Sequence, residues 1–265
     1  MDDLTRIGNK YDGGYILSKR QINKTEIVFS FGIWNNWAFE EDFSKRKDVA
    51  VYSYDYSTLA LLQKSVSSRI FWFFAYLAAA AYHLIRLRPS RVLDSLQRSR
   101  LKSNFYRFFN GRNKKYYIAK FISEHDDETN VCFDTIFKEL GEVKDLSIFL
   151  KMDIEGAEYA CLPQLAPYFD KINGMAVEFH GIGAMRDRFE ELLDKFSEKF
   201  YVSHIHGSNY AKLIEGADIP EVLEISFINK KIAPGGVALS EKRYPVKGLD
   251  NPCNPYKKDC ALRFV

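Results

Sequence analysis

The sequence lacks an apolar run long enough to cross a membrane as a helix. Its uninterrupted apolar stretch at residues 70–82 has 13 residues, whereas a transmembrane helix needs about 20. The first residues, MDDLT, are acidic and contain no apolar segment, so we expect no secretory signal. Both absences favour a cytoplasmic protein.

Cysteine and net charge are also scarce. The 4 cysteines include no CxxC pair, which leaves a zinc ribbon without support, and 265 residues can bury a core without a disulfide framework. A formal net charge of +3 is too small to indicate a nucleic-acid-binding surface, which needs clustered lysine and arginine. We therefore expect free thiols, no nucleic-acid partner and a single packed domain over residues 1–265.

Strand-like apolar runs alternate with helix-like stretches, as in repeated βα units. Apolar residues recur at helical spacing from Met185 to Phe200, which predicts an amphipathic crossover helix. The last two runs are joined by a loop containing Gly216 and Pro220, too short for such a helix, so these strands should pair antiparallel. The fold class is therefore α/β, with a Rossmann-like, doubly wound and mostly parallel sheet. Its seven predicted strands are residues 27–31, 49–54, 116–122, 146–152, 174–179, 201–206 and 222–229.

Residues 59–111 do not fit this plan. The apolar stretch at 70–82 is followed by a basic one at 86–102, which together predict a helical insertion after the second strand. We favour a buried helix or a contact with a second copy of the chain; the alternative is a helix on an anionic membrane surface, which would make the protein membrane-peripheral. The tail at 233–265 is rich in glycine and proline and is expected to be irregular.

The ends of the first two strands carry the signal for a cofactor. Gly32 follows the first strand, where a glycine lets the backbone approach a ligand that a Cβ would obstruct. The missing GxGxxG pattern argues against a dinucleotide. Asp55 ends the second strand, where a carboxylate can bind both ribose hydroxyls, although such an aspartate can also be a plain turn residue. We predict a nucleoside-binding site here.

At this point the sequence resembles the FkbM-type methyltransferases. The resemblance is carried by RIG and DGGY near the N-terminus, SFGIWNNWAFEEDF at 30–43, VYSYD at 51–55 and LKMDIEGAE at 150–158, and it continues through MAVEFH and EISFIN. It implies a class I methyltransferase fold and S-adenosylmethionine as the methyl donor. The chain departs from the family's pattern at Trp34 and Asn36. The residues predicted to bind the cofactor are Asp12, Gly13, Gly14, Tyr15, Ser30, Phe31, Gly32, Trp34, Asp55, Tyr56 and Ser123.

Acidic and imidazole side chains gather where the fourth, fifth and sixth predicted strands end. Ligands of open parallel sheets lie beyond these ends, and a spacing of two residues places both side chains of a pair on one face. The pairs are Asp153 with Glu155, Glu178 with His180, and His204 with His206. Each pair could instead be ordinary polar strand-end residues.

This cluster suits methyl transfer to oxygen, because a hydroxyl is a poor nucleophile until a base or a metal ion loosens its proton. We predict Asp153, Glu178, His180 and His206 as catalytic residues. A divalent metal ion, if the site holds one, would be bound by Asp153, Glu178 and His180.

The acceptor is not encoded in any motif. FkbM-like enzymes act on hydroxyls of natural products and of sugars in surface glycans, and the aromatic, basic insertion suits stacking on sugar rings. We expect O-methylation of a sugar hydroxyl in a surface polysaccharide or lipopolysaccharide. The alternatives are a small natural-product hydroxyl and a non-catalytic interaction domain that keeps the fold.

Overall fold

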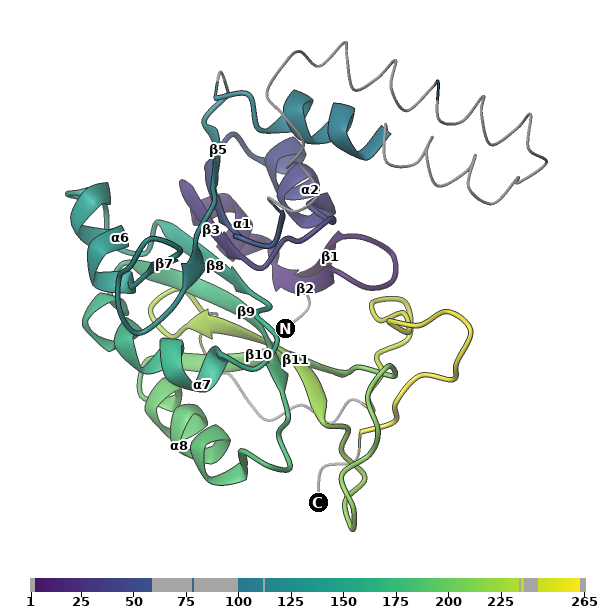
Figure 1. The fold of residues 1–265 in the computed structure, drawn as a ribbon. Helices are drawn as coiled ribbons and strands as arrows, with labels where there is room; N and C mark the ends of the chain where they lie inside the picture. The colour runs from purple at the N-terminus through teal and green to yellow at the C-terminus, as the bar shows by residue number, and fades with distance from the viewer. Residues whose placement is uncertain are drawn as a thin grey trace.

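A seven-stranded sheet forms the centre of the molecule, with the order β10-β11-β9-β8-β3-β4-β5 (Figure 1). The computed structural model describes residues 3–58, 78, 100–111, 113–233, 235 and 243–262. Neighbouring strands are parallel from β9 to β5, while β11 is antiparallel to both β9 and β10. The predicted mostly parallel α/β sheet with a closing antiparallel pair is thus confirmed. The strands are β3 (Ile27–Phe31), β4 (Ala50–Tyr54), β5 (Lys115–Ile118), β8 (Ile148–Met152), β9 (Ile172–His180), β10 (Phe200–Gly207) and β11 (Val222–Asn229).

Several predicted strand boundaries differ from the structure, and two of the differences have a clear backbone cause. The strand predicted at 116–122 ends at Ile118, because the chain turns there with a hydrogen bond from the Lys120 amide to the Ile118 carbonyl. Phe121–Ile122 then form β6, which pairs with β7 (Asn130–Val131) in a separate small sheet. The strand predicted to start at residue 146 starts at Ile148, because Leu146 has a left-handed φ of 56°.

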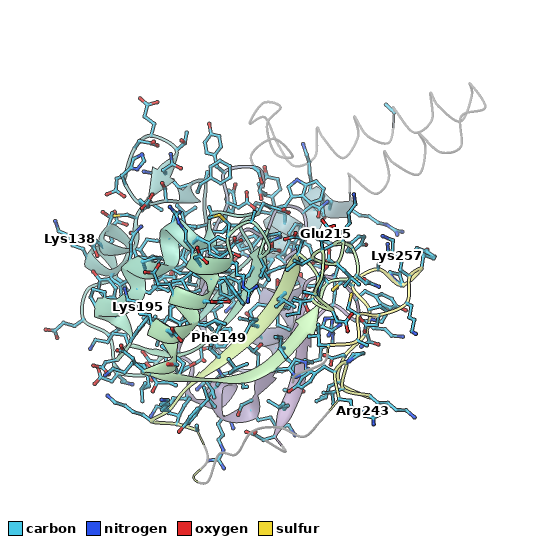
Figure 2. All side chains as sticks on the ribbon, turned by 90° about the horizontal axis from the view of Figure 1, so that it is seen from below. Lys138, Phe149, Lys195, Glu215, Arg243 and Lys257 are labelled. Carbon is cyan, nitrogen blue, oxygen red and sulfur yellow. The ribbon has the colours of Figure 1, made fainter. Side chains whose placement is uncertain are left out.

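Helices cover both faces of the central sheet. On one face, alternate side chains such as Phe29 and Leu150 form the larger core cluster under α6, α7, η1 and α8. On the other, Val28, Phe149 and Ala176 pack under α1, α2 and the hairpin β1–β2. These elements are α1 (Lys19–Lys24), α2 (Ala38–Arg46), α6 (Phe133–Leu140), α7 (Glu158–Cys161), η1 (Leu162–Tyr168), α8 (Arg186–Ser197), β1 (Leu4–Gly8) and β2 (Gly14–Ser18). Figure 2 shows Phe149 inside the fold and Lys138 and Lys257 at the surface.

The N-terminal hairpin β1–β2 is an element that the sequence did not predict. The two strands pair antiparallel with Ile7 opposite Tyr15. The DGGY segment is divided by the hairpin: Asp12 and Gly13, which has φ 76°, lie in the turn, whereas Gly14 and Tyr15 begin β2. The hairpin therefore carries Asp12 to the carboxyl edge of the central sheet.

Most of the predicted insertion at 59–111 lies outside the described residues. Its last part, residues 100–108, is helical. Phe105 of this helix packs edge-on against Trp37 and Tyr117, with ring centroids 5.4 and 5.0 Å apart. No helix among the described residues is long and apolar enough to cross a membrane.

The described part of the C-terminal tail, residues 243–262, has one isolated bridge, between Tyr244 and Leu262, and is otherwise irregular as predicted. All of the cysteines are free thiols.

Gly174 provides a test of the packing between α1 and β9. A Cβ at Gly174 would lie 1.7 Å from Nε2 of Gln21 and 2.7 Å from the carbonyl oxygen of Phe227, which share a buried hydrogen bond. We expect Gly174→Ala to lower the free energy of unfolding by about 1–3 kcal/mol through overpacking. Urea denaturation measures the change. In the matched control Gly235→Ala, the new Cβ has no described atom within 4 Å, so stability should hold. Equal midpoints for both variants would contradict the packing described here.

Candidate active site

A cavity of about 600 Å³ lies at the carboxyl ends of β3, β4 and β8. Parallel α/β sheets bind their ligands at this edge, and the volume is in the range of roughly 300–1,000 Å³ that small-molecule sites occupy. Of the residues predicted to bind a cofactor, Asp12, Gly13, Gly32, Trp34 and Asp55 line it. The structure therefore brings together the hairpin turn and the two strand ends that the sequence indicated.

The other predicted cofactor residues do not belong to the described lining. Phe31 and Tyr15 are buried in the two core clusters, and Gly14 is buried beside Tyr15 in β2. Tyr56 packs at a tilted angle against Phe121, which does line the cavity, with ring centroids 5.5 Å apart. The backbone carbonyl of Ser123 accepts a hydrogen bond from Gln164.

Ser30 is not part of the described lining of the cavity either, and its hydroxyl is bonded within the protein. It donates a hydrogen bond to Oε1 of Glu40, a residue of α2 that is 1% exposed and lines the cavity. Burial raises the pKa of Glu40, and its Oε2 has no hydrogen-bond partner among the described residues. Ser30 thus helps to hold the cavity residue Glu40 in place through this hydrogen bond.

Gly32 is required by the fold itself. Its φ is 75°, and a Cβ would lie 1.6 Å from the backbone oxygen of Asp153. The close approach of the turn after β3 to the end of β8 therefore explains this glycine, whereas the sequence argument assigned it to ligand approach alone. Because Gly32 also lines the cavity, any larger residue would displace the cavity wall.

The sequence left open whether Asp55 binds a ligand or is a plain turn residue, and the structure allows both roles. Its carboxylate accepts hydrogen bonds from the Trp34 amide at 2.5 Å, the Ser57 hydroxyl at 2.5 Å and the Thr58 amide at 3.1 Å. These bonds make it the cap of its turn and fix Trp34 at a φ of 37°. A carboxylate offers about four lone-pair sites, so one remains for a ligand in the cavity that Asp55 lines.

Lys151 is a site residue that the sequence argument missed. Its side chain is 5% exposed, and Nζ donates to the Gly32 carbonyl at 2.5 Å and lies 3.7 Å from Oδ2 of Asp153. The sequence does contain a sign of this residue's role, because the lysine stands inside an otherwise apolar strand, IFLKM. Lys151 supplies a positive charge to the cavity floor.

His180, at the end of β9, is held by a buried carboxylate. Its Nδ1 lies 3.0 Å from Oε1 of Glu158, the fully buried first residue of α7. An ionised carboxylate can only accept, so Nδ1 carries the proton and Nε2 is left as the basic atom. Nε2 lies 3.6 Å from Glu155, 3.8 Å from Glu178 and 3.9 Å from Asp153, measured to the nearest carboxylate oxygen.

The pKa of His180 is shifted by opposing effects. Burial lowers it, but the hydrogen bond to Glu158 and the charges of Glu158, Asp153 and Glu155 together raise the pKa above its ordinary value. The Glu158 carboxylate is itself fixed by the amides of Ile154 and Gly156, each at 3.2 Å. Glu158 and His180 therefore form an oriented acid–imidazole pair in which Nε2 readily accepts a proton.

A row of polar side chains crosses the three strands β9, β11 and β10 on the face that carries the hairpin. Strand register places Glu178 opposite Glu224, and Glu224 opposite His206. Asp12 joins from the hairpin turn, so that oxygens of Asp12, Glu178 and Glu224 lie within 4.8 Å of one another. Burial, then the charges of Asp153 and Glu224, raise the pKa of Glu178 well above its ordinary value.

His204 and His206 are bound to the C-terminal tail. Nε2 of His204 lies 2.7 Å from Asp250, and His206 lies between Glu224 at 2.9 Å and Asp259 at 3.0 Å. Burial lowers the pKa of His206, but hydrogen bonds to Asp259, Cys253 and Glu224 outweigh it and raise the pKa. Neither histidine belongs to the described lining of the cavity.

The predicted metal ligands are divided between two groups. Among the described residues, Asp153 and His180 group with Glu155, whereas Glu178 groups with Asp12 and Glu224. Within each group the ligand atoms lie within 4.8 Å of one another.

Residues 89–203 match the family model of the methyltransferase FkbM domain. This segment of the chain is similar to the FkbM methyltransferase domain. This confirms the resemblance in the sequence motifs and identifies an S-adenosylmethionine-dependent methyltransferase. The match includes Asp153, Glu158, Glu178 and His180 of the FkbM domain, while Gly32 and Asp55 precede it.

Solved methyltransferase structures are also similar to this chain. An rRNA methylase from Streptococcus thermophilus is 10% identical over 79% of this chain and 92% of its own, with a TM-score of 0.38. The precorrin-6y C5,15-methyltransferase from Geobacter metallireducens GS-15 is 7% identical over 79% and 86%, with a TM-score of 0.36. The plantazolicin methyltransferase BpumL, solved in complex with SAH, is 10% identical over 79% and 82%, also with a TM-score of 0.36. TM-scores this low establish neither fold nor function. No curated protein matches the chain.

Replacing Glu158 tests the acid–imidazole pair. We expect Glu158→Gln to lower the pKa of His180, because the variant loses the charge that favours the imidazolium ion. Titration of the imidazole by NMR measures the change. The matched control is Glu155→Gln: this carboxylate lies 3.6 Å from Nε2, but its side chain is 88% exposed and therefore screened, so the shift should be much smaller.

The same pair affects stability. Because the folded-state pKa of His180 is raised, the pair stabilises the protein below the ordinary histidine pKa of about 6.5. This contribution is lost as the pH rises through the raised value.

An unchanged His180 titration in Glu158→Gln would show that the pair does not control the imidazole.

Proposed function

We propose that the protein transfers the methyl group of S-adenosylmethionine to a hydroxyl of a sugar, in a surface polysaccharide or lipopolysaccharide. The observation that carries the proposal is the Glu158–His180 pair, whose basic Nε2 lies 3.9 Å from the cavity residue Asp153. Methyl transfer to an alcohol needs a base of this kind, because the hydroxyl must lose its proton. The sheet order agrees with a class I methyltransferase fold.

The residues of the cavity fit S-adenosylmethionine. Asp55 has a lone-pair site left for a ribose hydroxyl, and charge-assisted bonds of this kind are strong. Phe121 and Ile122 give the cavity an apolar wall suited to adenine. Gly32 and Asp153 lie at the other strand ends, where the methionine portion would reach the acceptor.

The chain's own residues would then act on the acceptor. Bound S-adenosylmethionine supplies an electrophilic methyl group on a sulfonium. Nε2 of His180 accepts the hydroxyl proton as the oxygen bonds to the methyl carbon, and the electron pair of the broken carbon–sulfur bond stays on sulfur. Glu158 stabilises the resulting imidazolium ion. Asp153, between His180 and the cavity, accepts a hydrogen bond from the acceptor and orients it.

An exposed aromatic side chain supports a sugar acceptor. Trp34 is 60% exposed and lines the cavity. Aromatic faces of this kind pack against the apolar faces of sugar rings. A small natural-product hydroxyl would use the same base, and a screen of glycans and small alcohols for formation of S-adenosylhomocysteine distinguishes the two acceptor classes.

Cofactor binding is the first test. Calorimetry should show that the wild type binds S-adenosylhomocysteine and that Asp55→Asn weakens binding by about tenfold or more, since a charged hydrogen bond contributes roughly 1.5–3 kcal/mol. The matched control is Asp127→Asn: Asp127 also caps a loop, through the amides of Thr129 and Asn130, but it is not among the cavity residues. If the folded wild type binds neither S-adenosylmethionine nor S-adenosylhomocysteine, the chain is a non-catalytic interaction domain.

The base is tested by His180→Ala. With an acceptor from the screen, turnover should fall by roughly 10²–10⁴-fold, the usual contribution of a positioned base, while the affinity for S-adenosylhomocysteine stays unchanged. His204→Ala is the control, because His204 is bonded to Asp250 of the C-terminal tail, whereas His180 groups with the cavity residues Asp153 and Glu155. Near-normal turnover of the His180 variant would exclude this residue as the base.

A further inference from the structure

Three carboxylates meet at one point beside the proposed acceptor site. Asp12 comes from the hairpin turn, Glu178 from β9 and Glu224 from the neighbouring strand β11, and oxygens of all three lie within 4.8 Å of one another. Glu178 and Glu224 are 8% and 5% exposed, whereas Asp12 is exposed and lines the cavity. The group is therefore buried on one side and reachable from the cavity on the other.

The neighbouring cations are committed to other partners. Lys151 donates to the Gly32 carbonyl and lies next to Asp153. His206 is placed between Glu224 and Asp259, so its charge is shared with a second carboxylate. His180 lies 3.8 Å from Glu178 but makes its hydrogen bond to Glu158. Like charges this close repel strongly in a partly buried site, so the group favours either a bound proton, in line with the raised pKa of Glu178, or a bound cation.

The hydroxyl of Tyr15 is a second, independent observation that points to a ligand. Tyr15 is 2% exposed, and its hydroxyl has no hydrogen-bond partner among the described residues. Nζ of Lys151 lies 6.0 Å from the centroid of the Tyr15 ring, and the charges of Asp153, Glu178, Glu224 and Asp12 all act on the Tyr15 hydroxyl. Buried tyrosine hydroxyls usually have a partner, so an unmet one beside three carboxylates indicates a group that binds there.

We propose that Asp12, Glu178 and Glu224 bind a divalent cation of the oxygen-preferring type, Mg²⁺ or Mn²⁺, with the Tyr15 hydroxyl meeting the ion's coordinated water. Carboxylates are the ligands that these ions select, and they keep water molecules in their shell. This ligand set shares only Glu178 with the set predicted from the sequence. The ion's role rests on the proposed function: through the open side at Asp12 it would bind the acceptor hydroxyl and make its proton easier to remove.

Binding of Mn²⁺ to the full chain tests the site. The signal of free Mn²⁺ in electron paramagnetic resonance falls when the ion binds, and we expect one site in the wild type whose affinity drops at least tenfold in Asp12→Asn and in Glu224→Gln. Glu155→Gln is the matched control, because Glu155 belongs to the other carboxylate group, with Asp153 and His180. Mn²⁺ affinity should be unchanged in this control.

Three results would overturn the proposal: no Mn²⁺ binding to the folded wild type, unchanged binding in Asp12→Asn, or a loss in Glu155→Gln instead. Circular dichroism establishes that each variant is folded; if Glu224→Gln is not, Asp12→Asn, at an exposed turn, decides the matter. Calorimetry with S-adenosylhomocysteine on the same wild-type sample separates the claims. Cofactor binding without Mn²⁺ binding overturns only the ion site, whereas Mn²⁺ binding without cofactor binding overturns the proposed methyl transfer.

Discussion

Lys151 lies buried in β8, where its ammonium group donates to the Gly32 carbonyl and approaches the carboxylate of Asp153. A buried amine is tolerated only when such partners replace water, so these groups cannot move independently. The bond fixes the turn after β3, which forms a wall of the cavity, relative to Asp153. In the proposed function, this one desolvated charge sets the distance between cofactor and acceptor.

The remaining charges at this edge form a connected series. Asp153 is followed by His180 and Glu158 on one side, and by Glu178, Glu224 and His206 on the other. In the first branch a buried carboxylate faces an imidazole, which raises the pKa of His180 and makes it a base. In the second branch burial and the facing carboxylates raise the pKa of Glu178 instead. The proposed proton transfer and the proposed cation binding thus fall to separate branches of one network.

Strands of the central sheet were predictable where apolar runs are bounded by turn residues. β3 and β11 lie where the sequence placed them, because their buried residues are continuous. The prediction failed where a single backbone conformation ends a strand, as at Leu146 with its φ of 56° and at the turn after Ile118. The hairpin β1–β2 was missed, because its short strands are stabilised by packing on the sheet and not by a pattern of their own.

The sequence by itself determined the fold class, the resemblance to FkbM-type methyltransferases and the strand ends at which a site was expected, since these follow from the order of apolar runs and from short motifs. It also indicated Asp12, His180 and Asp55. Only the tertiary structure decided that Glu158 is the partner of His180, that Lys151 lines the cavity and that Asp12 lies beside Glu178 and Glu224. It likewise showed that His204 and His206 are bonded to the C-terminal tail. The physical reason is that pairing between charged side chains depends on strand register and on contacts between distant segments. Glu158 and His180, for example, are 22 positions apart in the sequence, and local spacing does not specify that they meet.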